Sequence, residues 1–234
     1  KWHAINAINS LKQAWKIRSL DPEIAVFRAT LAEEEAAAAL ILSLKRKKYK
    51  NTDWLSWKNH KHKAGIQILY NIIVEAFRNK LWPGAKHELN IIPEAEDHGF
   101  RLDLTITEKD GAQSKYTLNE PLGFRTSLNG GVDTFAREIQ KILEDNGERK
   151  IEKYIEKWAN IRNRLLYATQ KGIPRLDSDT ETDIETYFRR TFRILGVFCV
   201  VDLGEKQTFV EQSMELLTEI FKKGMLGDQK IITV

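Results

Sequence analysis

The chain has 234 residues, 42% of them hydrophobic, which is enough to bury a real core in one large domain or two small ones. Its net charge of +4 is only mildly basic, and its longest apolar run, residues 194–201, is far shorter than the roughly 20 residues that span a bilayer. Neither disorder nor a membrane-spanning segment is therefore expected. The single cysteine, Cys199, lies in that apolar run, and no signal peptide is visible, so we expect a buried, inert thiol and a cytoplasmic protein.

The N-terminal part of the chain predicts two antiparallel helices. Residues 2–19 have one apolar face and end before Asp21 and Pro22. The second helix, residues 22–50, begins with Asp21 as its N-cap and Pro22 at its first position, and it ends in a basic run that suits the negative end of a helix. An apolar stripe continues along this helix, so we expect the rest of the protein to be built around it.

Three consecutive glutamates interrupt that stripe. At about 100° per residue, Glu34 and Glu35 fall on the two edges of the apolar face, whereas Glu33 points away from it. The four alanines at 36–39 follow at once and allow another helix to come close at the same level. We therefore expect a site beside Glu34 and Glu35.

The middle of the chain changes character. Helical spacing predicts a third helix over residues 54–79, capped by Thr52 or Asp53. Beyond it, glycine, proline and acidic residues replace the helical period, and alternating apolar residues predict a β-hairpin with strands at 100–107 and 114–118. Two strands alone are marginally stable, so the hairpin is expected to lean on helices or on a partner.

Helical spacing resumes in the last hundred residues. It predicts helices at 133–143, closed by a left-handed cap at Asn146 and Gly147, and at 151–172, 178–201 and 209–221. The expected fold class is therefore mainly α. It comprises N-terminal helices of one bundle at 1–83, a small β-hairpin insertion at 84–131, and C-terminal helices of the same bundle at 132–234.

A basic segment with interleaved aromatic residues runs from Lys45 to Lys63. Its cations are Lys45, Arg46, Lys47, Lys48, Lys50, Lys58, Lys61 and Lys63, with Asp53 as the only acid, and Tyr49, Trp54 and Trp57 lie among them. Cations that neutralise phosphates beside rings that stack on bases are typical of a single-stranded nucleic-acid surface. The alternative is a solvated helix end and turn with the tryptophans directed into the core.

Several motifs of known chemistry are missing. The sequence has no glycine-rich phosphate loop, no CxxC pair, no HExxH and no nucleophile elbow. His60 and His62 are two residues apart, which on a helix sends them to different faces and argues against a shared metal. We expect no metal site and no cofactor.

One arginine lies on the apolar stripe of its own helix. Arg162 follows Trp158 by four residues and precedes Leu165 by three. A buried guanidinium must have a partner, because an unpaired one costs several kcal/mol, and Glu34 or Glu35 is the natural candidate. Two interpretations remain open: an ion pair between helices and nothing more, or a polar pocket in which the arginine and neighbouring amides face a phosphate.

Residues 162–167 resemble a known family motif. Arg162 and Asn163 match the start of the RNxxxH motif of HEPN domains, helical modules that in many bacterial defence and toxin systems cleave RNA as dimers with the motif at the interface. Tyr167 stands where that motif has histidine. The segment Leu31–Glu35, with Trp54, Trp57, His60 and Lys63, is also similar to the pattern of AbiV-type abortive-infection proteins, which are themselves HEPN-like.

The resemblance covers the helices at 2–79 and 148–199 and implies a HEPN-like helical bundle. It implies a bacterial anti-phage protein, in abortive infection, that binds or cleaves RNA as a homodimer. Arg162 would hold the scissile phosphate, Asn163 would orient it, and Glu34 would fix Arg162 or His60. Tyrosine, with a reference pKa of ~10, is a poor base, so either His60 moves the proton in place of Tyr167 or hydrolysis is lost.

The cations expected to contact RNA are Lys47, Lys48, Lys58, Lys61, Lys63 and Arg164. The alternative function is a catalytically inactive protein-interaction module, a sensor or inhibitor subunit of a defence system, whose hairpin offers a sheet edge to a partner strand. Nucleotide or small-ligand binding between the helices is a third, less supported hypothesis.

Overall fold

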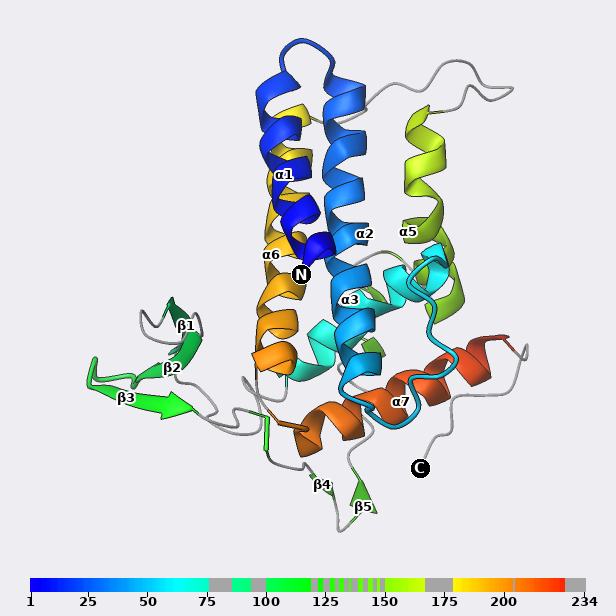
Figure 1. Cartoon of the computed structure of the whole chain (residues 1–234). Helices are drawn as coiled ribbons and strands as arrows, with labels where there is room; N and C mark the ends of the chain where they lie inside the picture. The colour runs from blue at the N-terminus through cyan, green and yellow to red at the C-terminus, as the bar shows by residue number, and fades with distance from the viewer. Residues whose placement is uncertain are drawn as a thin grey trace.

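The protein is mainly helical, with a small antiparallel sheet beside the helices (Figure 1). This computed structural model describes residues 1–75, 86–93, 100–118, 150–166, 179–203 and 205–225, together with 122–123, 127–128, 131–132, 135, 139–140, 143–144 and 147. Its described helices are α1 (Trp2–Ile17), α2 (Pro22–Arg46), α3 (His60–Glu75), α5 (Ile151–Leu166), α6 (Thr180–Leu203) and α7 (Thr208–Met225). Its described strands are β1 (Lys86–Pro93), β2 (Phe100–Thr107), β3 (Gln113–Leu118), β4 (Ser127–Leu128) and β5 (Gly131–Val132).

Helix α2 is the element against which most of the others pack, as predicted. It starts where the sequence indicates, since the Asp21 side chain accepts a hydrogen bond from the Ile24 backbone nitrogen at 3.0 Å. Helices α1, α6, α5 and α3 all pack on it, and it lies between α1 and α5 in Figure 1. The four alanines at 36–39 are buried, and their small side chains let these neighbours approach. Helix α6 runs parallel to α2, because Glu33 meets Arg190 and Ser43 meets Asp202.

Helix α3 begins later than the sequence suggests. Asn59 is its cap: the Asn59 Oδ1 atom accepts from the Lys61 nitrogen at 2.9 Å. Thr52 is not a cap, because its hydroxyl donates to the Tyr49 carbonyl at 2.9 Å. The prediction of a helix from residue 54 is therefore wrong at its start. Trp54 and Leu55 are apolar because they pack in the core. The spacing of Trp54 and Trp57 imitates a helical period.

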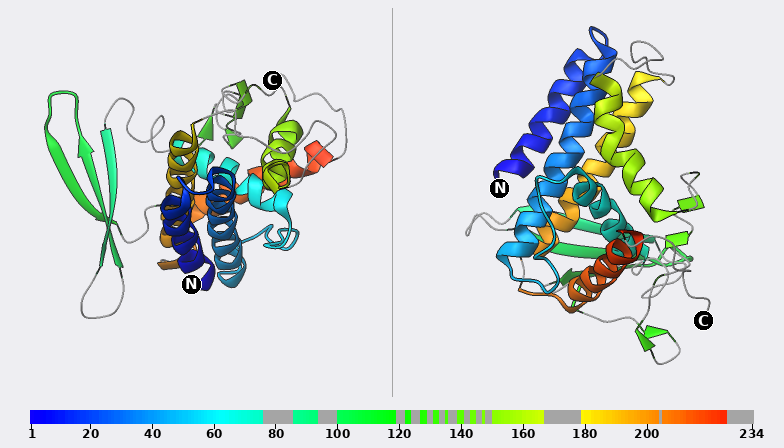
Figure 2. Two further views of the ribbon diagram at one scale, coloured as in Figure 1. Left: turned by 90° about the horizontal axis from the view of Figure 1, so that it is seen from above. Right: turned by 90° about the vertical axis from the view of Figure 1, so that its right-hand side faces the viewer.

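The larger sheet has three strands in the order β1-β2-β3, all antiparallel, and β4 and β5 form a second antiparallel pair. Strands β2 and β3 form the predicted hairpin, with the turn at Gly111, whose φ of 88° lies in the left-handed region that favours glycine. Strand β1 was not predicted; it pairs along the whole of β2, with Leu89 opposite Leu104. The hairpin thus gains a third strand as support, and the sheet stands to one side of the helices (Figure 2).

The C-terminal helices largely follow the sequence pattern. Helix α6 is capped by Asp179, whose carboxylate accepts from the Thr182 nitrogen at 3.0 Å. The predicted helix at 133–143 is described only in part: the Ile139 nitrogen donates to the Phe135 carbonyl at 2.9 Å. The predicted left-handed cap at Gly147 is confirmed by its φ of 67°. The expected continuation of α5 to residue 172 lies outside the described residues.

The apolar run at 194–201 forms the C-terminal half of α6 and enters the core. Cys199 within it is only partly buried, whereas the sequence predicts a buried thiol. Burial nevertheless raises the pKa of the Cys199 thiol, and the Asp202 carboxylate adds to this, which favours the protonated form. Among the described helices, none is both long and apolar enough to cross a bilayer.

Two helical glycines give a matched stability prediction. A Cβ atom at Gly65 of α3 would lie 2.4 Å from ring atoms of Phe221 on α7, whereas one at Gly196 of α6 would meet nothing within 4 Å. We expect Gly65→Ala to destabilise the protein by about 1–3 kcal/mol through overpacking. Gly196→Ala should stabilise it by up to about 1 kcal/mol, because alanine favours the helix. Urea unfolding followed by circular dichroism measures the free energy of unfolding of both variants. Equal changes in this free energy for Gly65→Ala and Gly196→Ala would contradict the close α3–α7 packing.

Candidate functional site

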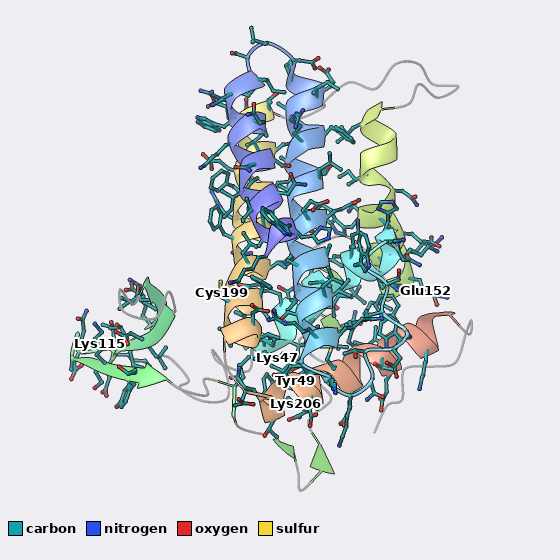
Figure 3. All side chains as sticks on the ribbon, viewed as in Figure 1. Lys47, Tyr49, Lys115, Glu152, Cys199 and Lys206 are labelled. Atoms are coloured by element: carbon teal, nitrogen blue, oxygen red, sulfur yellow. The ribbon has the colours of Figure 1, made fainter. Side chains whose placement is uncertain are left out.

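The three consecutive glutamates of α2 each reach a different partner. Glu33 pairs with Arg190 of α6, Glu34 with His60 and Lys63 of α3, and Glu35 with His3 of α1. Consecutive residues on a helix point about 100° apart, so a helix enclosed by several neighbours directs each side chain to another element. Figure 3 shows the side chains that fill the spaces between these helices.

Glu33 and Arg190 form a buried, two-pronged ion pair. The Arg190 Nε and Nη2 atoms donate to the two oxygens of Glu33, each at 2.7 Å, and only 10% and 12% of the respective side chains are exposed. The guanidinium also lies over the Trp158 ring, with its Cζ atom 3.6 Å from the ring centroid. Burial alone would lower the pKa of Arg190, but the charge and hydrogen bonds of Glu33 outweigh it and raise that pKa. The Arg190 guanidinium is therefore held in its charged form.

This pair corrects one sequence interpretation. Glu33 was expected to point away from the core, and it is instead the least exposed of the three glutamate side chains. The prediction for Glu33 assumed that α2 buries a single apolar stripe. In the structure α6 covers another side of α2, and Glu33 lies on that side. Arg190 itself was missed, although it follows Tyr187 by three residues and precedes Ile194 by four, which places it on the apolar stripe of its helix.

Glu34 holds one histidine and one lysine from α3. Its two carboxylate oxygens lie 2.9 Å from the His60 Nδ1 atom and 2.9 Å from the Lys63 Nζ atom. His60 and Lys63 are three residues apart, so both lie on the helix face that meets α2. The side chain of Lys63 is only 11% exposed, so this predicted RNA-contacting cation is directed inward. His60, at 34%, remains accessible from outside.

His60 forms the wall between two spaces. Outside it lies a groove of about 460 Å³, which we call the His60 groove, and its lining residues are Ser56, Lys58, Asn59, His60, Lys61, Ala159 and Asn160. Inside lies a cavity of about 20 Å³, lined by residues that include Glu33, Glu34, Lys63 and Trp158. The cavity is large enough for one water molecule. Trp158, which lines this cavity, has a buried Nε1 atom with no hydrogen-bond partner among the described residues.

Only some cations of the basic segment line the His60 groove. Lys58 and Lys61 line the groove and are exposed, and the Lys61 ammonium lies 3.5 Å from the Glu156 carboxylate. That carboxylate has a lowered pKa, caused first by Lys153 and then by Lys61. The predicted cations Lys47 and Lys48 follow the end of α2 and are not among the residues that line the groove; Figure 3 labels Lys47 beside Tyr49.

The two tryptophans of this segment behave differently. Trp54 is partly buried, and its Nε1 atom donates to the Thr218 hydroxyl at 2.9 Å, so it belongs to the packing against α7. Trp57 is 36% exposed and lies with its ring centroid 5.2 Å from that of His3. Trp54 is therefore a core residue, as the alternative interpretation expects, whereas Trp57 lies at the surface.

His62 faces away from His60, as its spacing predicts. Its Nδ1 atom accepts from the Ser56 nitrogen at 2.9 Å, and its ring packs against Trp54 and Phe221. Burial, followed by the charge of Lys45, lowers the pKa of His62, so this histidine is held neutral as a structural residue. Among the described residues, no group of three or more histidine, cysteine or acidic side chains is placed to hold a metal ion.

The predicted motif on α5 is described through its backbone alone. The side chains of Arg162, Asn163 and Arg164 lie outside the described residues, and so does Tyr167 altogether. Position 162 follows Trp158, which lines the inner cavity, by one helical turn, and positions 163 and 164 follow Asn160, which lines the groove, by one turn. The pairing of Arg162 with Glu34 or Glu35 stays a prediction, and both carboxylates have the partners given above.

The fold and the site together define a helical-bundle protein with a small sheet and a carboxylate-held histidine at an open basic groove. In comparisons with known proteins, the chain matches no family model, no curated protein and no solved structure.

Proposed function

We propose that the protein binds single-stranded RNA in the His60 groove and cleaves it without a metal. The observation that carries this proposal is His60, held at its Nδ1 atom by Glu34 and exposed to a groove that also contains Lys58 and Lys61. The resemblance of residues 162–167 to the HEPN motif supports the same activity. On that basis the protein would be a HEPN-like cytoplasmic homodimer that acts in bacterial anti-phage defence.

The proposed chemistry follows from the contact between Glu34 and His60. A carboxylate at Nδ1 favours the tautomer with hydrogen on that nitrogen, so Nε2 carries the lone pair that accepts a proton. His60 would take the proton of a ribose 2′-hydroxyl, the 2′-oxygen would attack phosphorus, and the bond from phosphorus to the 5′-oxygen would break. The leaving 5′-oxygen takes up a proton from water, and the hydroxide that remains is neutralised by the proton that His60 has accepted. The products are a 2′,3′-cyclic phosphate and a 5′-hydroxyl end.

The residues of α5 complete this proposal. Arg162 would bind the scissile phosphate and Asn163 would orient it, the roles that the family resemblance implies. Arg164 would contact a neighbouring phosphate with Lys58 and Lys61. Lys63, which lies against Glu34, would instead balance the charge of the carboxylate that holds His60. Tyr167 has no proton-transfer role in this scheme, because a phenol is a poor base near neutral pH.

Binding is tested by reversing the groove's charge. We expect the double variant Lys58→Glu/Lys61→Glu to bind oligouridine at least about tenfold more weakly than wild type, since two phosphate contacts are lost. The wild-type affinity should also fall steeply between about 50 and 200 mM salt. Fluorescence anisotropy with labelled oligouridine measures both effects.

The matched control for this test is Lys109→Glu/Lys206→Glu, which makes the same change of charge at two exposed lysines outside the groove. This control should bind with an affinity close to that of wild type. Equal weakening of the two double variants would show that the net charge alone governs binding, and absent binding by wild type would contradict the proposed site.

A second candidate function is favoured by exposed apolar side chains. Trp2, Ile5, Trp15, Phe188 and Phe192 are all more than a third exposed, which is typical of a surface that binds another protein. Under this alternative the protein is a catalytically silent interaction module, and the outer strand β3 offers a further sheet edge to a partner. Wild-type protein that leaves RNA unbound and uncut would favour this function.

A further inference from the structure

Trp57 places an accessible indole ring beside polar side chains. Its ring centroid lies 5.2 Å from that of His3, and the Lys58 Nζ atom lies over the ring, 5.2 Å from its centroid. The neighbouring Trp54 packs against the core, whereas Trp57 is 36% exposed. The indole of Trp57 can therefore be reached by a ligand from outside.

The loop between α2 and α3 is held in place on both sides of Trp57. Before it, Leu55 is buried, and the Ser56 nitrogen donates to the His62 Nδ1 atom at 2.9 Å. After it, the Asn59 nitrogen donates to the Ser56 carbonyl at 3.1 Å, and α3 begins at the next residue. The backbone around the ring is thus ordered before a ligand arrives, and such preorganisation favours binding.

Lys58 connects the ring of Trp57 to the His60 groove. It lines the groove, and its ammonium also lies over the indole. The distance of 5.2 Å from the ring centroid is within the ~6 Å range of cation–π contacts, which at exposed sites are worth only about 0.5–1 kcal/mol. The ammonium can therefore leave the ring for a phosphate at low cost, and this movement uncovers the face of the indole that it occupies.

An indole face beside a phosphate-binding cation fits an unpaired nucleobase. Every base has a π face, so stacking on an aromatic side chain is independent of the base's hydrogen-bonding groups, and one such contact is worth about 1–3 kcal/mol. A nucleotide carries its base and its phosphate on one sugar, so a phosphate held by Lys58 brings a base close to Trp57. Lys58 and Lys61 favour this anionic ligand over an apolar peptide.

We propose that Trp57 forms a base-stacking subsite beside the His60 groove, occupied by one unpaired base of a strand whose phosphate contacts Lys58. This inference rests on the proposed RNA binding and adds recognition of the bases, which the lysines of the groove do not contact. It accounts for a single-stranded ligand, because the bases of a duplex are paired and stacked on one another. The contact contributes to affinity, and proton transfer at His60 does not depend on it.

Fluorescence anisotropy with two labelled ligands tests the subsite. One is oligouridine with methylated 2′-oxygens, so that it stays uncut, and the other is an abasic oligomer with the same length, sugars and phosphates. Wild type should prefer oligouridine, and this preference should shrink at least about fivefold in Trp57→Leu, because the base then has no ring on which to stack. Trp57→Phe should keep part of the preference, since phenylalanine retains an aromatic face.

Trp15→Leu is the matched control. Trp15 of α1 is also exposed, at 41%, and also has a cation over its ring, with the Arg18 Cζ atom 4.0 Å from the centroid, but it does not line the groove. The control should bind both oligomers as wild type does. Circular dichroism measures whether each variant is folded.

Tryptophan fluorescence gives a second measurement that does not depend on Trp57→Leu. A base stacked on an indole quenches its emission, so oligouridine should quench wild-type fluorescence more than the abasic oligomer does. Trp57→Phe should lose this difference, and Trp15→Phe should keep it. Quenching that is the same in wild type and Trp57→Phe would overturn the inference.

The outcomes separate failure of the subsite from failure of the groove. Equal preference for oligouridine in wild type and Trp57→Leu would overturn the subsite and leave RNA binding intact. Equal weakening of both oligomers by Trp57→Leu would show that the ring only supports Lys58, and it would overturn the subsite as well. Wild type that binds neither oligomer would contradict the groove itself, and the subsite with it.

Discussion

Arg190→Ala is expected to destabilise the protein by about 3–5 kcal/mol, the loss typical of breaking a buried ion pair from one side. The reason is that Glu33 would remain in the interior as an uncompensated charge, with only 12% of its side chain exposed. The same variant removes the guanidinium from the Trp158 ring and removes a positive charge near Tyr154, whose pKa is raised by burial. Urea unfolding at neutral pH, followed by circular dichroism, measures the change in free energy.

The preceding residue provides the matched control. Arg189 is also an arginine of α6 paired with a glutamate, at 2.9 Å from Glu185, but the two side chains are 69% and 57% exposed. Arg189→Ala should therefore cost no more than about 0.5 kcal/mol. The double variant Glu33→Leu/Arg190→Met should be more stable than Arg190→Ala, because apolar side chains of similar size leave no buried charge. Similar losses for Arg189→Ala and Arg190→Ala would contradict the buried pair.

His60→Ala is expected to reduce RNA cleavage at least about 100-fold, the usual contribution of a general base. Glu34→Gln should reduce it less, because the amide still contacts His60 but no longer stabilises the protonated ring. Both rates are measured with an end-labelled RNA under single-turnover conditions. The comparison separates proton transfer from binding, since the affinity of His60→Ala for RNA should change little.

His3→Ala is the control for this experiment. His3 is also a partly buried histidine on a glutamate of α2, with its Nδ1 atom 2.6 Å from Glu35, but it does not line the groove. Its removal should leave the cleavage rate near that of wild type. Equal rates for His60→Ala and wild type would remove His60 from the mechanism and leave the interaction module as the better hypothesis.

The two adjacent glutamates thus have separable expected effects. Glu33 and Arg190 join α2 to α6 and bring Trp158 to the inner cavity, so their loss should appear in stability. Glu34 and His60 form the wall of the groove, so their loss should appear in the cleavage rate. The contrast arises from a rotation of about 100° between neighbouring positions on one helix.

Local signals in the sequence were sufficient to predict where most of the helices begin. Asp21 caps α2 as predicted, and Asp179 caps α6 next to the predicted start at residue 178, because a cap depends on residues that are close in the chain. Asn59 was overlooked as the cap of α3, since Trp54 and Trp57 continue an apparent helical period. Trp54 is apolar because it packs against α7, and that contact depends on residues more than a hundred positions away.

The site was predicted less completely than the fold. The proximity of Glu34 to His60 was one of two partnerships considered, and the structure contains that contact. Arg190 escaped notice although it satisfies the same criterion that singled out Arg162. The apolar stripe of α2 could not identify Glu33 as the partner of Arg190, because other helices pack on several sides of α2. Which side of α2 faces a buried charge depends on how α6 packs against it.

The most direct test of the account is the fate of single-stranded RNA incubated with wild-type protein in a chelator. We predict cleavage that leaves 2′,3′-cyclic phosphate ends, while the same RNA with methylated 2′-oxygens stays intact, because the attacking hydroxyl is then blocked. His60→Ala should leave both RNAs uncut. Intact unmethylated RNA with wild type, or cleavage of the methylated strand, would contradict the central claim.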